Sequence, residues 1–153
     1  MRPLLPARPL VAALALLTVT ACSSGLSVPP PDPAPTGAAA YACSALHGRL
    51  PNEVLGQTVT PTKPPSPLTS AWGEPSIVLR CGVGVPAALT PTSSLLTVDG
   101  VDWLPEQLTH GYRFTTVGRA VNVEVSVPDA YSPEAGALAD LSPAVIATIP
   151  AAS

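Results

Sequence analysis

The chain has 153 residues, of which ten are acidic and seven basic, and its formal net charge is -3. This length predicts one compact domain. Charged residues make up only 11% of the chain and 21 residues are proline, which is unlike the composition of a freely soluble cytoplasmic enzyme. The seven basic residues are spread singly, so they cannot form the positive stripe that a nucleic-acid backbone requires, and we expect no nucleic-acid binding.

Residues 1–21 have the plan of a secretory signal peptide. Basic Arg2 and Arg8 precede an apolar run from Leu10 to Val19, and small residues follow it. The run is about half as long as a membrane-spanning helix, so a permanent transmembrane span is not expected. The sequence therefore predicts export.

Cys22 stands where a lipid-modified cysteine would stand. The run Val19-Thr20-Ala21-Cys22 resembles the bacterial lipobox, in which the cysteine receives a diacylglyceryl group and becomes the new N-terminus. The alternative is a non-lipidated signal that is cut near the same place. Two acyl chains would hold the protein stably on a membrane, so we expect an anchor at Cys22 on the outer face of the cytoplasmic membrane.

Residues 22–40 are rich in proline, alanine, serine and glycine. Such a stretch has too few large apolar residues to pack a core, and it predicts an extended, polyproline-like tether of up to about 50 Å. One folded domain is then expected over residues 41–153. Its first helix is predicted from Tyr41 to about Leu50, because Cys43 and Leu46 fall on one helical face and Pro51 ends the pattern.

The middle of the chain changes from an irregular stretch to strands. Prolines 61, 64, 65 and 67 predict that residues 57–70 lack regular structure. In contrast, residues 77–83 alternate as a half-buried strand, with Cys81 on the apolar side and Arg80 on the other.

Cys43 and Cys81 are the cysteines that remain once Cys22 is lipidated. Both face the predicted core, and an oxidising exterior would allow them to pair. A disulfide closing about 38 residues contributes about 4 kcal/mol in the chain-entropy model. A redox thiol or a metal ligand is the alternative, but the chain has no Cys-x-x-Cys motif and no nearby His and Cys cluster. We therefore predict a structural disulfide.

The second half of the chain predicts a meander of strands followed by a helix. Strands are expected over residues 94–98, 101–104, 112–117 and 120–127, with Asp99-Gly100 as a two-residue hairpin turn. Ser132-Pro133-Glu134 predicts the start of a helix over residues 132–139. Pro143 is expected to end that helix, leaving residues 144–149 as a short separate piece. The fold class is therefore α+β: a small antiparallel sheet of four or five strands, a helix at each end and one disulfide.

Residues suited to catalysis are few. His47 and His110 are the two histidines of the chain, and Asp99 and Asp102 could be read as paired carboxylates. His47 is interpreted as a packed or rim residue, and His110 and Asp99 as turn residues. The nucleophile, nucleotide, zinc and calcium motifs are all missing from the sequence. We expect neither an enzyme nor a metal or cofactor site; an enzyme acting on cell-wall material through these four residues is the alternative.

Binding is the better-supported expectation. Most of the aromatic and guanidinium groups of the domain gather at a few positions, and with Glu74 they could line a shallow groove for an anionic or sugar-like ligand. For the two tryptophans themselves, the hydrophobic core is the favoured interpretation, because large aromatic residues dominate small cores. The candidate binding face consists of Trp72, Glu74, Arg80, Trp103, Tyr112 and Arg113.

Four blocks of the chain resemble one family. The run from Trp72 to Val83, with the neighbouring runs at residues 88–93, 98–103 and 113–119, is similar to the actinobacterial family of exported proteins called DUF3515. The use of six arginines to one lysine also suits a GC-rich actinobacterial genome. The resemblance implies a small secreted or membrane-attached envelope protein with a cysteine pair. It assigns no activity, so no catalytic residue is carried over. The partner is expected to be an envelope protein or a cell-wall ligand.

Overall fold

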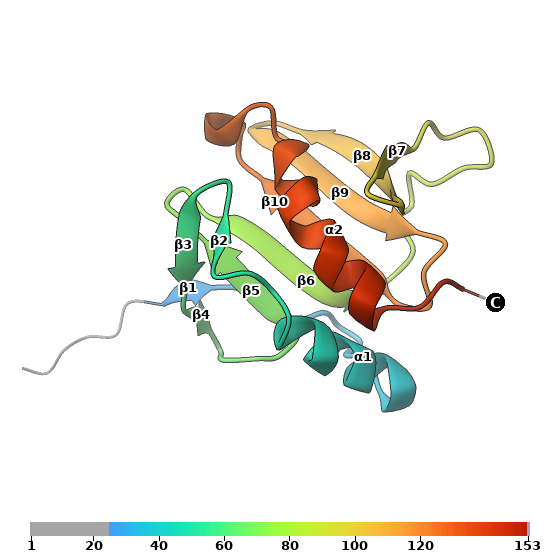
Figure 1. The fold of residues 1–153 in the computed structure, drawn as a ribbon, viewed down its shortest axis with the longest axis horizontal. Coiled ribbons are helices and arrows are strands. Elements are labelled where there is room, and N and C mark those ends of the chain that lie inside the picture. Colours follow the sequence, from blue (N-terminus) through green and yellow to red (C-terminus); the bar gives the residue numbers. More distant parts are fainter. Residues whose placement is uncertain (1–24, 153) are drawn as a thin grey trace, which may run out of the picture.

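A computed structural model describes residues 25–152 of the chain (Figure 1). Eight strands form one sheet in which all neighbouring strands are antiparallel. In spatial order they are β2 (Glu53–Val54), β3 (Gln57–Thr60), β5 (Thr69–Trp72), β6 (Ile77–Val83), β10 (Asn122–Val127), β9 (Gly111–Val117), β8 (Val101–Leu108) and β7 (Leu96–Val98). The α+β class is confirmed, but the sheet has more strands than the four or five expected.

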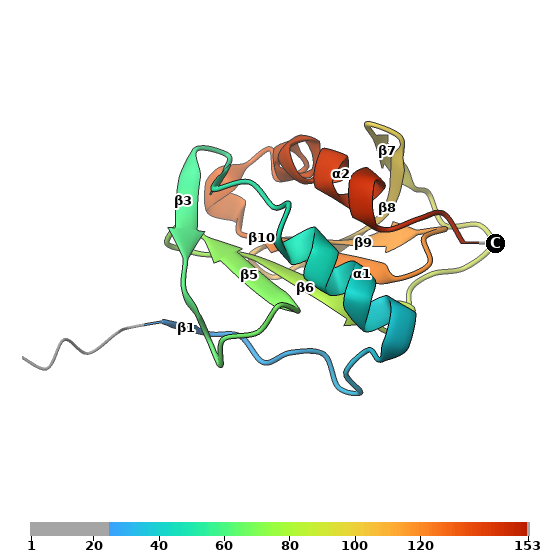
Figure 2. The ribbon, with the colours of Figure 1, turned by 60° about the horizontal axis from the view of Figure 1, so that its bottom comes forward.

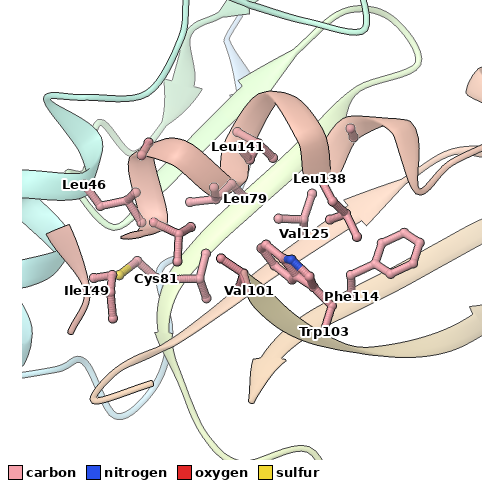
Figure 3. Close-up of a cluster of buried hydrophobic side chains, with 14 of the residues drawn as sticks. Leu46, Leu79, Cys81, Val101, Trp103, Phe114, Val125, Leu138, Leu141 and Ile149 are labelled. Carbon is pink, nitrogen blue, oxygen red and sulfur yellow. The ribbon is translucent and has the colours of Figure 1, made fainter. Parts of the chain in front are cut away.

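Two helices cover one face of the sheet, which we call the helix-covered face. They are α1 (Gly37–His47) and α2 (Gly136–Thr148), and they contact each other as well as the strands below them. Alternate strand residues such as Leu79, Val125 and Trp103 are buried beneath them. Figure 3 shows the Trp103 ring under α2, beside Val125 and Leu138. Burial of this apolar set is the main stabilising contribution to the fold.

The predicted disulfide is confirmed, and it joins the two layers. Cys43 of α1 is bonded to Cys81 of β6, with Cα atoms 5.6 Å apart, and both residues are fully buried. The bond fixes the N-terminal helix to a central strand of the sheet.

The opposite face of the sheet carries no helix, and we call it the open face. The chain from Gly25 to Thr36 passes along this side before entering α1 (Figure 2). Its first part, β1 (Leu26–Ser27), pairs in parallel with β4 (Thr62–Lys63). Val28 is buried there, at 4% exposure.

The expected tether is therefore wrong for the part of it that the structure describes. Helix α1 begins at Gly37, four residues before the predicted start at Tyr41. The preceding segment is extended, as predicted, but it packs on the domain: the β1 backbone pairs with β4, and Val28 is buried. The predicted signal peptide and the lipid site at Cys22 lie outside the described residues.

The prediction of an irregular stretch over residues 57–70 is also wrong. Strands β3, β4 and the start of β5 lie within it. The four prolines fall between these short strands and so interrupt few ladder hydrogen bonds.

The C-terminal helix differs from its prediction at both ends. A short 3-10 turn, η1 (Asp129–Tyr131), comes first, and α2 begins only at Gly136, so Ser132 does not cap α2. Pro143 lies inside α2, which continues to Thr148. Its neighbours Leu141, Ser142, Ala144 and Val145 are buried, and this packing outweighs the loss of one helical hydrogen bond.

The remaining strands follow the sequence closely. β6 has the predicted bounds, and the Asp99-Gly100 hairpin joins β7 to β8 with both turn residues at positive φ, 47° and 78°. β7 begins two residues after its predicted start. β8 extends beyond its predicted end to Leu108, because it pairs along its length with β9. Within residues 25–152, neither helix is long and apolar enough to cross a membrane.

Candidate functional site

Four charged residues cross the open face on adjacent strands. We call this set, Arg80, Glu124, Arg113 and Glu106, the charged ladder. Arg80 of β6 pairs in register with Glu124 of β10, and Arg113 of β9 pairs with Glu106 of β8. In each of these strands, the apolar residues next to the charged one face the helices. The charged side chains of the ladder therefore point to the opposite side, the open face.

The charges of the ladder alternate and contact one another. The Arg80 guanidinium donates through Nε to Glu124 Oε1 at 3.0 Å, and its Nη2 lies 3.0 Å from the same oxygen. Arg113 lies between the two carboxylates, with Nη1 3.9 Å from Glu124 Oε2 and Nε 3.4 Å from Glu106 Oε2. The ladder therefore balances its own charge.

The arginines of the ladder are more accessible than the glutamates. The side chains of Arg80 and Arg113 are 32% and 37% exposed, against 13% and 20% for Glu124 and Glu106. Ion pairs this exposed contribute only about 0.2 to 1 kcal/mol each. The carboxylates thus orient two guanidinium groups, and each guanidinium stays partly accessible to solvent.

The ladder forms the floor of a groove with two hollows. The first hollow, of about 440 Å³, lies between the ladder and the segment Leu26–Pro29 and includes Ser76, Val78 and Ser126. The second hollow, of about 190 Å³, lies under the loop after β6 and includes Gly84, Pro86, Ala87 and Thr115. Arg113 and Glu124 line both hollows, so the two are adjacent.

The six residues of the predicted binding face do not share a face. Only Arg80 and Arg113 lie on the open face. Glu74 is exposed in the turn between β5 and β6. The aromatic members, Trp72, Trp103 and Tyr112, are on the helix-covered face.

The tryptophans belong to the core, which confirms the interpretation favoured from the sequence. Both are fully buried, and the indole of Trp72 donates to the Pro51 carbonyl at 3.0 Å. Tyr112 is half-buried and stacks on Phe114, with ring centroids 5.8 Å apart. These rings cannot contribute to a groove on the other side of the sheet.

The catalytic candidates are dispersed. His47, at the end of α1, is hydrogen-bonded to Ser70 Oγ at 3.1 Å, and His110, in the β8–β9 turn, lies 3.7 Å from an Asp129 oxygen. Asp102 accepts a hydrogen bond from Thr97 at 2.5 Å in the β7–β8 hairpin. His47 is exposed, so of the two interpretations given for it, packed or rim, the structure supports the rim position. Within residues 25–152, no group of three His, Cys, Asp or Glu residues could hold a metal ion.

Sequence reasoning missed Glu106, Glu124, Thr115, Ser76 and Ser126. The alternation of β10 indicates that Glu124 and Ser126 face away from the core. It does not indicate which strands lie beside β10, because the order β6-β10-β9 joins segments about 40 residues apart. A search for opposite charges on the polar sides of the predicted strands could have suggested the pair Arg80 and Glu124.

Comparison with known proteins gives a family and no activity. No curated protein and no solved structure matches the chain. One family model, described as a protein of unknown function, DUF3515, matches residues 7–153. The match covers nearly the whole chain, in agreement with the four sequence blocks, and the chain therefore belongs to the DUF3515 family.

Proposed function

We propose that this protein is a lipid-anchored cell-envelope protein that binds a ligand in the groove of its open face. The observation that carries the proposal is the charged ladder, which holds two half-exposed guanidinium groups on the floor of a groove. Guanidinium groups that are oriented by carboxylates are preorganised to donate paired hydrogen bonds to a ligand.

The surroundings of the ladder support binding over a purely structural role. The ladder lies on the central strands β6, β10, β9 and β8, and two chain segments border it, near Val28 and near Pro86. Ligand sites are concave and combine apolar walls with a few polar groups, and the groove has both.

The chain near Gly25 relates the groove to the proposed membrane anchor. A lipid on Cys22 would be only three residues from Gly25, a span of at most about 11 Å. β1, which follows Gly25, borders the first hollow. A lipid at Cys22 would therefore hold the groove near the membrane surface, far closer than a free tether of residues 22–40 would.

Crosslinking in intact cells tests the binding function. We expect partners that co-purify with the wild-type protein to be lost from the double variant R80A/R113A while the protein stays folded. Arg49→Ala is the matched control, because Arg49 is an exposed arginine that lines neither hollow. An unchanged set of partners for the double variant would overturn the proposal.

The anchor is tested separately at Cys22. We expect Cys22→Ala to release the protein from the membrane fraction or to leave it unprocessed, because the acceptor of the lipid is gone. Intact-mass analysis of the wild-type protein should show the added diacylglyceryl group. An unmodified Cys22 in the wild-type protein would contradict the lipid anchor and leave the groove as a separate question.

A further inference from the structure

We infer that the groove binds a short peptide of two or three residues with a free N-terminal ammonium and a free C-terminal carboxylate. The inference rests on the proposed binding function and adds the chemical class of the ligand. Three features carry it: the unequal charge of the two hollows, buried polar atoms without partners, and the distance between the ends of the site.

The two hollows carry opposite excess charge. The first is lined by two arginines, Arg80 and Arg113, and by the single carboxylate of Glu124. The second is lined by two carboxylates, Glu106 and Glu124, and by the single guanidinium of Arg113. The first hollow therefore favours an anionic group and the second favours a cationic group. A ligand that fills both has a negative end and a positive end.

Two residues that line the second hollow have buried polar atoms without hydrogen-bond partners. Thr115 is 1% exposed, and its Oγ1 has no partner among the described residues. The Nε atom of Arg113 is also buried and has no hydrogen-bond partner among the described residues. It lies 3.4 Å from Glu106 Oε2, but this contact does not have the geometry of a hydrogen bond. Buried polar atoms are normally satisfied. Trp103 Nε1 and Ser142 Oγ are also without partners but lie in the core, so it is the position of Thr115 and Arg113 beside the second hollow that makes them contacts for a ligand.

The two orphan atoms require different ligand atoms. A threonine hydroxyl can accept a hydrogen bond from an ammonium, beside the carboxylates of Glu106 and Glu124. The Nε atom of Arg113 can only donate, so it requires an acceptor at the middle of the groove. A peptide carbonyl is an acceptor at that place, between a terminal ammonium in the second hollow and a terminal carboxylate in the first.

The length of the site excludes a single α-amino acid. Arg80 and Thr115 both pair in register with Glu124, from opposite sides, so they lie two strand spacings apart, about 10 Å. An α-amino acid has its ammonium and carboxylate on the same carbon and cannot bridge the hollows. Each added residue extends a peptide by about 3.5 Å, so two or three residues match the span once the Arg80 side chain reaches inward.

Binding of five probes to the full-length protein in detergent tests the inference by calorimetry. We expect dialanine to bind, and free alanine, N-acetyl-dialanine and dialanine amide each to bind at least about tenfold more weakly, because each lacks one charged end or the span. Equal binding of the blocked and the free dipeptides would overturn the inference. So would tighter binding of phosphoethanolamine, a zwitterion without a peptide bond.

Two variants assign the ends of the peptide. Thr115→Val should weaken the binding of dialanine about tenfold and leave the affinity for N-acetyl-dialanine unchanged. Arg80→Ala should leave the affinity for dialanine amide unchanged. Arg49→Ala should alter none of the affinities, and a thermal melt confirms that each variant is folded. If both variants lost affinity for the same probes, the proposed orientation of the peptide would be wrong.

The outcome also separates this inference from the proposed function. If dialanine fails to bind while R80A/R113A still loses its cellular partners, the groove is a binding site for another chemistry and the peptide assignment is wrong. If dialanine fails to bind and the double variant keeps its partners, both proposals are wrong.

Discussion

The two faces of the sheet are built from the same strands but have opposite roles. On the helix-covered face, alternate residues of β6, β10, β9 and β8 are buried under α1 and α2, and the disulfide joins the layers there. On the open face, the intervening residues of these strands form the charged ladder and its groove. One face therefore accounts for most of the stability, and the other carries the groups that are free to bind.

This division means that substitutions on the two faces should have different effects. Changes on the helix-covered face should lower the free energy of unfolding by several kcal/mol, because they remove buried contacts or the covalent link. Changes in the ladder should alter binding and leave the domain folded, because partly exposed ion pairs contribute little. Four predictions test this comparison.

The largest effect is expected from the disulfide. Replacing Cys43 and Cys81 together by serine should lower the free energy of unfolding by about 4 kcal/mol and the melting midpoint by more than about 10 °C. The double variant avoids leaving one free thiol. In the wild-type protein, labelling without reductant should modify neither cysteine; quantitative labelling would show that the bond is absent.

A smaller effect is expected from the two buried tryptophans, which form a matched pair. Trp103→Phe should cost about 2 kcal/mol, since its indole nitrogen has no partner among the described residues and the change removes volume alone. Trp72→Phe should cost about 1 kcal/mol more, because it also leaves the Pro51 carbonyl without its hydrogen bond. Denaturant titration of both variants measures the difference. Equal costs would show that this hydrogen bond contributes nothing to stability.

Gly82 tests the place where the N-terminal segment meets the sheet. It has a φ of 91°, it is skipped in the pairing of β6 with β10, and a Cβ there would lie 2.4 Å from Cγ of Pro35. Gly82→Ala should therefore cost about 2 kcal/mol. Gly118→Ala is the control, because Gly118 also has a positive φ but nothing lies within 4 Å of its Cβ position. The control should cost about 1 kcal/mol, and equal costs would show that the Pro35 contact does not constrain the segment.

The smallest effect on stability is expected at Arg80. Arg80→Ala should change the free energy of unfolding by less than about 1 kcal/mol, because the side chain is partly exposed and Glu124 keeps a second arginine nearby. A chemical denaturation curve measures this change. Unfolding of the variant would identify Arg80 as a structural residue and remove the main support for the groove.

Local patterns predicted the elements that local interactions determine. The β6 strand, the Asp99-Gly100 hairpin and the inward direction of Cys43 and Cys81 all follow from alternation, turn preference and helical spacing. The same alternation placed Arg80 opposite the core. It could not decide between core and groove for Trp72 and Trp103, because a large aromatic ring suits either place.

Elements that depend on distant partners were not predictable in this way. Pro143 reads locally as a helix break, yet α2 continues through it because its neighbours are buried on the sheet. The proline-rich segment before α1 reads as a free tether, yet Leu26–Ser27 pairs with Thr62–Lys63. In both cases tertiary contacts outweigh the local preference of proline.

The sequence by itself determined the family, the α+β class, the disulfide pair and the polar or apolar side of each main strand. Only the tertiary structure decided that β10 lies between β6 and β9, and so that Glu124 lies between Arg80 and Arg113. The direction of a side chain from a strand is set by the backbone of that strand, within a few residues. The neighbours of that side chain are set by which strands pair across the chain, and that choice depends on the packing of the whole domain.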